Sequence, residues 1–253
     1  MSGLAGIAGR VALVSGGGQG IGRAICQRLA DEGARVAVND LNPETAAAVA
    51  AEVGGIPAVF DVADRAAADA GIAAVEAELG AVSLLACNHA WMTMAPFLET
   101  PDDELMRHLD VNLVGTANLV QRCLPGMRAQ GYGRIVAMTS EWGVIGWPNA
   151  TAYAASKGGI IAFVKSVARA HAREGISANL VAPGTTDTPQ LDVDAVDAGL
   201  THEEMVAVYA KDSPLQRINR PEDQAAAVAF LLSEPAIALV GQILSPNGGT
   251  TRL

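Results

Sequence analysis

Aromatic residues are scarce in this chain: Phe, Trp and Tyr make up 4% of its 253 residues, although 50% of the residues are hydrophobic. A core must therefore be built from Ala, Val, Leu and Ile. No apolar run approaches the roughly 20 residues that a membrane-spanning helix needs. The first nine residues are apolar but lack the basic start of a secretion signal. We expect a cytoplasmic protein with no membrane partner.

Cysteine, histidine and positive charge are also in short supply. Cys26, Cys87 and Cys123 have no disulfide-like or metal-like spacing, so we expect reduced core residues. No two of the four histidines have metal-ligand spacing with acids nearby, so no metal site is expected. Lys and Arg number 17 against 27 Asp and Glu, a net charge of −10. That balance argues against nucleic acid or an anionic membrane as a partner.

Apolar strand candidates alternate along the chain with helix candidates. The strands are expected near 10–15, 35–39, 56–60, 83–87, 133–139, 176–182 and 241–244. The helices are expected near 20–32, 43–52, 65–79, 101–129, 151–173 and 221–232. This alternation predicts an α/β fold with a doubly wound parallel sheet of about seven strands and helices on both faces, a Rossmann fold. No linker or repeat divides the chain, so residues 1–253 are expected to form one dinucleotide-binding domain.

A glycine-rich turn follows the first expected strand. The residues after Ser15 read Gly-Gly-Gly-Gln-Gly-Ile-Gly, ending at Gly22, and a helix pattern follows. Glycines let the backbone approach a pyrophosphate closely, and the free N–H groups of a helix N-terminus favour its charge. The spacing Gly-x-x-x-Gly-x-Gly is looser than the commoner dinucleotide-binding pattern, and a plain strand-turn-helix could also use these glycines.

Tyr153 and Lys157 lie four residues apart in an expected helix, so they share one face. An ammonium beside a phenol favours the phenolate, which can take a proton from an alcohol. Lowering a phenol pKa by roughly three units requires about 4 kcal/mol of differential stabilisation. We expect the ammonium and a nearby cationic cofactor ring to supply it. Alone, the spacing is also common on solvated helix faces.

Together these motifs resemble the short-chain dehydrogenase/reductase family in its single-domain form, over nearly the whole chain. The matching features are Ser15–Gly22, the adenine-binding pair Asp61 and Val62, Asn112 in its helix, Ser140 thirteen residues before Tyr153, the turn Pro183-Gly184-Thr185-Thr186-Asp187-Thr188, Pro221-Glu222-Asp223 and Gly248-Gly249. The resemblance implies that Tyr153 is the general acid and base and that Lys157 lowers its pKa and binds the nicotinamide ribose. Ser140 would hydrogen-bond the substrate oxygen, and Asn112 would distort its helix and hold a water of a proton relay.

Two segments depart from the family pattern. Its Asn-Asn-Ala-Gly is Cys87-Asn88-His89-Ala90 here, and its terminal Asp-Gly-Gly is Asn247-Gly248-Gly249. Ala in place of Gly reduces backbone freedom where the chain passes the cofactor ribose. These changes affect the expected details of cofactor binding and pocket shape. Of the histidines, only His89 is expected near the cofactor, and His108, His171 and His202 are expected to be ordinary surface or helix residues.

NAD is the expected cofactor. Asp40 ends the second strand 18 residues after Gly22, where an acid can accept hydrogen bonds from the adenosine ribose, although it could also simply cap the next helix. The positions where family members that use NADP carry a basic residue hold Gln19 and Leu41. The expected cofactor-binding residues are Gly16, Gln19, Gly20, Ile21, Gly22, Asp40, Leu41, Asp61, Val62, Asn88, Tyr153, Lys157, Pro183, Gly184, Thr186 and Thr188.

The substrate side is expected to be apolar. All three tryptophans fall in two segments near the expected site, which favours a pocket wall over core packing. The expected pocket residues are Trp91, Met92, Glu141, Trp142 and Trp147, with Glu141 as a polar handle. Residues 189–213 follow the cofactor motif directly and are expected to form a mobile lid, with a capping box at Thr201–Glu204 opening a short helix. An ordered surface excursion is the alternative.

The sequence therefore predicts an NAD-dependent oxidoreductase that interconverts a secondary alcohol and a ketone with Ser140, Tyr153, Lys157 and Asn112. The family also implies a homotetramer or homodimer through the helices near 101–129 and 151–173. One alternative is a 3-oxoacyl-thioester reductase, but Gln130 and Glu174 lie where basic residues should meet an acidic carrier. A cofactor-free lyase on the same scaffold, such as a halohydrin dehalogenase, and a non-catalytic NAD sensor are weaker alternatives. The sequence does not identify the substrate, its stereochemistry or the physiological direction of the reaction.

Overall fold

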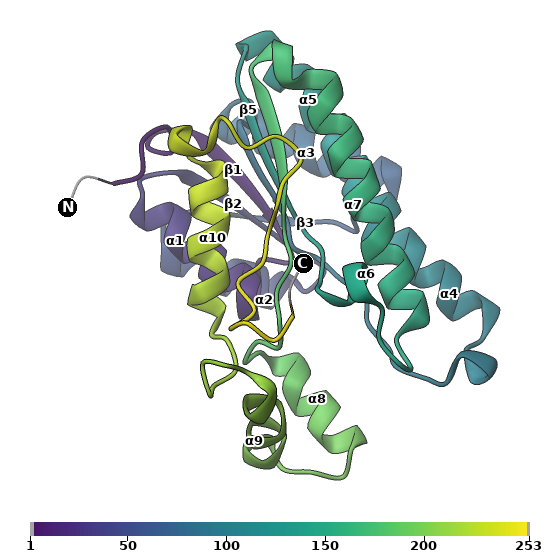
Figure 1. Cartoon of the computed structure of the whole chain (residues 1–253). Helices are drawn as coiled ribbons and strands as arrows, with labels where there is room; N and C mark the ends of the chain where they lie inside the picture. The colour runs from purple at the N-terminus through teal and green to yellow at the C-terminus, as the bar shows by residue number, and fades with distance from the viewer. Residues whose placement is uncertain (1–2, 252–253) are drawn as a thin grey trace.

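Seven parallel strands form one sheet in the order β3-β2-β1-β4-β5-β6-β7 in this computed structural model, which describes residues 3–251 (Figure 1). The strands are β1 (Val11–Ser15), β2 (Arg35–Asp40), β3 (Ile56–Val59), β4 (Leu84–Cys87), β5 (Gly133–Met138), β6 (Ile176–Val181) and β7 (Ile243–Leu244). The doubly wound sheet predicted from the sequence is confirmed. Because the order reverses between β1 and β4, a crevice for ligands opens at their carboxyl ends.

Helices cover both faces of this sheet (Figure 1). One face carries α1 (Gly20–Asp31), α2 (Pro43–Val53) and α10 (Pro221–Leu232), and the other carries α3 (Arg65–Leu79), α5 (Gly115–Gln130) and α7 (Thr151–His171). The shorter helices are η1 (Phe97–Glu99), α4 (Asp102–His108), η2 (Leu109–Val114), α6 (Trp142–Ile145), η3 (Ala172–Glu174), α8 (Pro189–Asp197), α9 (His202–Asp212) and η4 (Glu234–Ala236). Pro43 and Pro221 open their helices, as expected for first-turn prolines.

The central strand β1 contributes side chains to the hydrophobic cores on both faces of the sheet. Val11 and Leu13 pack among α3, α5 and α7, whereas Ala12 and Val14 pack among α1, α2 and α10. Successive strand side chains point to opposite faces, so a strand covered on both sides must be apolar at every position. The side chains of all five β1 residues, Ser15 included, are buried. The three cysteines are buried and free, as predicted.

The single helix expected near 101–129 is interrupted by the π-helical turn η2. Asn112 lies in this turn, and its amide donates to the carbonyl of Trp91 and accepts from the Trp91 N–H, at 3.0 and 2.7 Å. Thr116 Oγ1 donates to the Asn112 carbonyl at 2.7 Å. A π turn inserts an extra residue into the helical ladder and reorients the side chains around it. Here it directs Asn112 toward the segment that follows β4.

Residues 189–213, expected to form a lid with one short helix, contain two helices. They form α8 and α9, which project beyond the carboxyl ends of the strands (Figure 1). Leu191, Ala195, Met205 and Ile218 form a small apolar cluster between them. The capping box is confirmed, because Thr201 accepts from the Glu204 N–H and Glu204 accepts from the Thr201 N–H. Within residues 3–251, no helix combines the length and hydrophobicity needed to cross a bilayer.

Gly22 sets a testable constraint on the first turn. A Cβ at this position of α1 would overlap the Gly16 carbonyl oxygen, which is backbone and cannot yield easily. We expect Gly22→Ala to lower the free energy of unfolding by about 1–3 kcal/mol, in the range of overpacking substitutions. Gly126→Ala in α5 is the matched control, because its Cβ would meet only ordinary contacts. Chemical denaturation should show little loss for the control, and equal losses for the two variants would contradict this account.

Candidate active site

One cavity of about 1150 Å³ opens along the carboxyl edge of the sheet. It is large enough for a dinucleotide with a small second molecule, since typical ligand pockets measure about 300–1,000 Å³. Of the residues expected to bind a cofactor, those that line it are Gly16, Gln19, Gly20, Ile21, Asp40, Leu41, Asp61, Val62, Asn88, Tyr153, Lys157, Pro183, Gly184, Thr186 and Thr188. Gly22 does not line it, because it packs on the Gly16 carbonyl beneath the turn.

The glycine turn forms a cradle at one end of this cavity. Gly16 and Gly20 have φ angles of 60° and 51°, a region that favours glycine. Helix α1 begins at Gly20, and no side chain caps the N-terminus of this helix. Its free N–H groups and the positive end of the helix dipole are therefore available to an anion. The residues present fit the pyrophosphate of a dinucleotide.

Asp40 closes the same end of the cavity. Its carboxylate accepts from the Gly18 N–H at 3.0 Å through Oδ2 and from the Asn42 N–H at 3.1 Å through Oδ1. The helix cap of α2 is Asn42, which accepts from the Glu44 and Thr45 N–H groups. The capping role that the sequence left open for Asp40 therefore belongs to its neighbour. Asp40 is left facing the glycine turn, with Leu41 exposed beside it.

Lys157 ties α7 to the end of β5. Its Nζ donates to the Met138 carbonyl at 2.8 Å, and its own carbonyl accepts from Thr139 Oγ1 at 2.9 Å. Nζ lies 5.5 Å from the centroid of the Tyr153 ring. Burial lowers the pKa of Lys157 to about 8, against a smaller raising effect of Cys87. Tyr153 and Lys157 on α7 and Ser140 after β5 therefore line the same cavity.

The phenol of Tyr153 holds its proton more tightly than the sequence suggested. Burial raises the pKa of Tyr153 to about 12, and the negative charge of Asp194 adds to this, while a hydrogen bond with Ser140 opposes it. Desolvation penalises the charged form of a phenol. Without a cofactor, the protein's own groups therefore do not lower this pKa, and the expected lowering would require the cofactor ring as well. The remaining candidate for lowering the pKa of Tyr153 is positive charge brought by a bound cofactor.

His89 lies beneath the glycine turn and lines the cavity, as expected. Its Nδ1 is 2.6 Å from Ser15 Oγ, and the Asn88 N–H donates to that same hydroxyl at 3.2 Å. Burial, followed by the charge of Lys157, lowers the pKa of His89 to about 3. His89 is therefore a neutral structural link between the end of β1 and the end of β4.

The expected substrate residues fall into two groups. Trp91, Met92, Glu141 and Trp142 line the cavity. Trp147 does not; it is 42% exposed and stacks on Trp142 with ring centroids 5.0 Å apart. The outer tryptophan therefore supports the inner one instead of contacting a ligand directly.

Glu141 lines the cavity as expected, but one of its carboxylate oxygens is already engaged within the protein. Its Oε2 accepts from Asn247 Nδ2, Thr250 Oγ1 and Thr251 Oγ1, at 3.3, 2.9 and 2.8 Å. The side chain is buried, so these hydrogen bonds satisfy a carboxylate that would otherwise be costly to desolvate. Glu141 thus fastens the C-terminal segment next to Ser140.

Asn112 does not line the cavity; it hydrogen-bonds residues that lie next to it. Besides its two bonds to Trp91, its Nδ2 donates to Ser156 Oγ at 2.9 Å, and Ser156 donates to the Tyr153 carbonyl at 2.7 Å. The helix distortion that the resemblance implied is present in η2.

Several residues near the site were missed or misread in the sequence; Arg107, for example, also lines the cavity. Asp194 and Tyr209 line the cavity from α8 and α9. His108 was expected to be ordinary, but it is buried, and its ring lies 6.4 Å from the Tyr153 ring in an edge-on arrangement. Its spacing of four residues from Asn112 was a usable signal, because it places both on one helix face. No comparable signal marks Asp194 or Tyr209.

Known proteins resemble the chain over almost its entire length. The family described as enoyl-(acyl carrier protein) reductase matches residues 16–251. The 2-dehydro-3-deoxy-L-rhamnonate dehydrogenase (NAD(+)) of Sphingomonas sp. (strain SKA58) is 38% identical over 96% of both chains. The galactitol 2-dehydrogenase of Agrobacterium fabrum (strain C58 / ATCC 33970) is 35% identical over 95% of this chain and 96% of that one.

A solved structure shares the same fold. The crystal structure of levodione reductase superposes with a TM-score of 0.90 at 29% identity, covering 96% of this chain and 97% of that chain. The strand order, the glycine turn at the switch point and the Ser140, Tyr153 and Lys157 wall agree with these similarities. The chain belongs to the short-chain dehydrogenase/reductase family of oxidoreductases.

Proposed function

We propose that this enzyme is an NAD-dependent dehydrogenase that interconverts a secondary alcohol and a ketone. The observation that carries the proposal is the shared cavity, in which Ser140, Tyr153 and Lys157 form one wall and the glycine turn forms the far end. An acid or base within reach of both a cofactor and a second molecule suits alcohol oxidation. NAD bound there would supply the hydride acceptor.

Each of the three residues has a distinct proposed role. Tyr153 takes the hydroxyl proton during oxidation and returns it during ketone reduction. Ser140, which lines the cavity with Tyr153, contacts the substrate oxygen and keeps it beside the phenol. Lys157, held by the Met138 carbonyl, presents its ammonium to the cofactor ribose and to the phenol. Trp91, Met92 and Trp142 provide an apolar surface for the rest of the alcohol.

A 3-oxoacyl-thioester reductase is the alternative within the family. Two similarities support this alternative: the family description, and the acetoacetyl-CoA reductase of Rhizobium meliloti (strain 1021), which is 35% identical. Carrier docking would need free basic residues near the ends of α5 and α7. Arg128 lies there, but its Nε is 2.6 Å from Glu174 Oε2. This pairing reduces the attraction of Arg128 for an acidic carrier, although Arg169 and Arg173 lie near the same end of α7.

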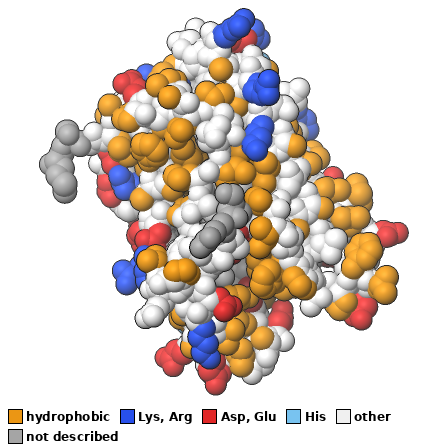
Figure 2. All heavy atoms as spheres, viewed as in Figure 1, with side chains coloured by type: hydrophobic (Ala, Val, Ile, Leu, Met, Phe, Trp, Pro, Cys, Tyr) orange, Lys and Arg blue, Asp and Glu red, His pale blue; other side chains and the backbone are white. Residues whose placement is uncertain are grey.

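We also propose one domain over the whole chain and a homotetramer or homodimer built through α5 and α7. Apolar side chains exposed on or next to these helices support the assembly; Val114, for example, is 42% exposed. The face in Figure 2 shows further groups of exposed hydrophobic side chains between isolated charged ones. Such patches favour protein contacts.

A screen of secondary alcohols with NAD tests the reaction, with cyclic, aryl and polyol members and a 3-oxoacyl thioester with NADH as the competing class. We expect Tyr153→Phe to bind NAD normally and to lose about 10²–10⁴-fold in kcat on the best alcohol, because only the phenol oxygen is removed. Lys157→Ala should lower both kcat and cofactor affinity. More than a tenth of the wild-type kcat in Tyr153→Phe would defeat the assignment.

NAD should be preferred over NADP. A 2′-phosphate next to Asp40 would meet a like charge at short range, and Gln19 and Leu41 offer it no cation. We expect at least about a tenfold advantage in kcat/KM, which corresponds to about 1.4 kcal/mol. Asp40→Ala combined with Leu41→Arg should relax or reverse the preference. Equal kcat/KM values for the two cofactors in the wild type would show that Asp40 does not face the ribose.

Asp194 should contribute to the pH dependence, after the larger effect of burial. The productive form for oxidation is the phenolate, so kcat/KM should rise with pH as Tyr153 ionises. The charge of Asp194 raises the pKa of that phenol. Asp194→Asn removes a like charge and should move the rising limb of the profile to lower pH. Asp197→Asn, an exposed acid on the same helix that does not line the cavity, is the control. Identical profiles for Asp194→Asn and wild type would refute this electrostatic link.

A further inference from the structure

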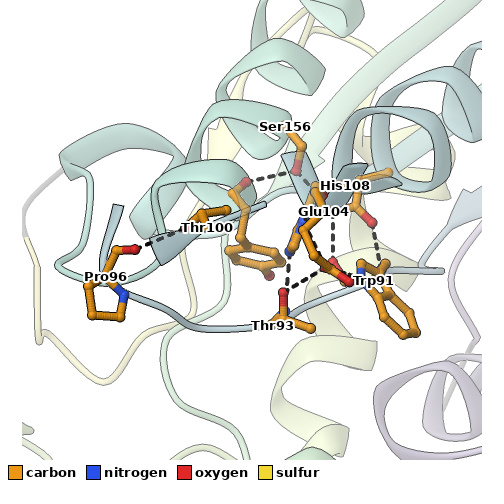
Figure 3. Close-up of polar contacts among 9 residues, drawn as sticks. Trp91, Thr93, Pro96, Thr100, Glu104, His108 and Ser156 are labelled. Atoms are coloured by element: carbon orange, nitrogen blue, oxygen red, sulfur yellow. Dashed lines mark hydrogen bonds and ion pairs between the residues drawn. The ribbon is translucent and has the colours of Figure 1, made fainter. Parts of the chain in front are cut away.

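The segment that follows β4, residues 90–100, brings Trp91 and Met92 to the cavity. Apart from the short turn η1 it has no regular secondary structure, so other contacts must fix its position. Figure 3 shows that Glu104 and His108 of α4 supply such contacts, and Asn112 of the neighbouring π turn adds two hydrogen bonds to Trp91. Glu104 and His108 do not line the cavity themselves.

Glu104 holds two residues of this segment with one oxygen. Its Oε2 accepts from Trp91 Nε1 at 3.1 Å and from Thr93 Oγ1 at 3.0 Å (Figure 3). These hydrogen bonds are the main reason that the pKa of Glu104 is lowered. On the face of the same indole, the Arg107 guanidinium lies 3.6 Å from the ring centroid. The Trp91 ring is therefore fixed at its edge by Glu104 and on its face by Arg107.

His108 holds the backbone of the same segment. Its Nδ1 is 2.7 Å from the Glu104 carbonyl, and its Nε2 is 3.2 Å from the Thr93 N–H. A carbonyl can only accept and a backbone N–H can only donate, so Nδ1 carries the proton and Nε2 is bare. Both hydrogen bonds thus require the neutral imidazole in one tautomer. The ring that makes them also contacts the edge of Tyr153.

A second connection joins the segment to Tyr153. Asn112 bonds both the N–H and the carbonyl of Trp91, and Ser156 links that amide to the Tyr153 carbonyl. The wall formed by residues 91–93 and the proposed acid–base residue are therefore connected through α4 and through η2. A displacement of α4 against the wall would change the distance between the substrate surface and the phenol.

We infer that Glu104 and His108 are positioning residues that fix the substrate-facing wall, residues 91–93, relative to Tyr153 and thereby determine which alcohols fit. The inference rests on the proposed function of this cavity. Glu104 sets the orientation of the indole, and His108 sets the backbone beneath it. Substrate choice then depends on residues that a ligand does not touch, since a wall free to move would accept larger alcohols and hold small ones poorly.

Paired substitutions test Glu104. Glu104→Gln retains an oxygen that can accept both hydrogen bonds, whereas Glu104→Leu removes the acceptor at similar size. We expect Glu104→Leu to raise KM for the best alcohol about tenfold, the effect of roughly one or two lost hydrogen bonds, with less change in kcat. It should also relax the preference between small and bulky alcohols. Glu104→Gln should stay within about threefold of wild type, and KM for NAD should be unchanged in both.

His108 is tested in the same way. His108→Gln can place an acceptor near the Thr93 N–H, whereas His108→Ala cannot. We expect His108→Ala to lower kcat and raise KM for the alcohol, because both the wall and the Tyr153 contact are lost, and His108→Gln to recover most of the KM change. Glu99→Gln, an exposed change in the same segment, is the control. Thermal unfolding of every variant separates this effect from a general loss of stability.

Amide hydrogen exchange gives a readout that needs no substrate. Protection of the Trp91 and Thr93 amides should fall in Glu104→Leu and His108→Ala and should be retained in Glu104→Gln, with sheet amides unchanged. Unchanged exchange, or equal kinetic loss in the Leu and Gln variants, would overturn the inference. If wild-type enzyme oxidises no alcohol, the proposed function fails, while the exchange result still decides whether Glu104 and His108 hold this wall.

Discussion

The attachment of α7 to the end of β5 is the interaction on which the rest of the site depends. Lys157 Nζ bonds the Met138 carbonyl, and Thr139 bonds the Lys157 carbonyl, so one helical turn is fastened to one strand end from both sides. Gly143 makes this possible, because a Cβ there would lie 2.8 Å from Lys157 Cβ. Ser140 follows the strand and Tyr153 precedes the lysine by one turn, so their relative positions follow from this attachment.

The same burial that fixes these groups also opposes their charged forms. The pKa of Lys157 is lowered to about 8 and that of Tyr153 is raised to about 12, both chiefly through desolvation. Proximity of an ammonium and a phenol is therefore insufficient to produce a phenolate here. The protein by itself holds a protonated phenol, and Asp194 strengthens that state. Under the proposed function, oxidation would depend on positive charge added when the cofactor is bound, which would couple cofactor binding to proton transfer.

Local patterns in the sequence predicted the sheet, most helices and the cavity wall, because apolar periodicity and glycine spacing determine them directly. Contacts between distant residues were not predictable. Nothing local in the sequence shows that Thr251 donates a hydrogen bond to Glu141 from 110 residues later. His108 and Trp147 were misassigned for the same reason: burial and stacking depend on neighbouring elements. The two helices within 189–213 were partly visible, since only α9 carries a capping box.

The ionisation of Tyr153 tests the central claim most directly. The chain has three tyrosines, so tyrosine labelled with ¹³C at Cζ gives three signals, and Tyr153→Phe identifies one of them. Without cofactor, we expect the Tyr153 signal to remain that of a protonated phenol beyond the ordinary tyrosine pKa of about 10. With NAD bound, it should titrate at lower pH. A Tyr153 signal that ionises below about pH 10 without cofactor, or that NAD does not move, would contradict this account.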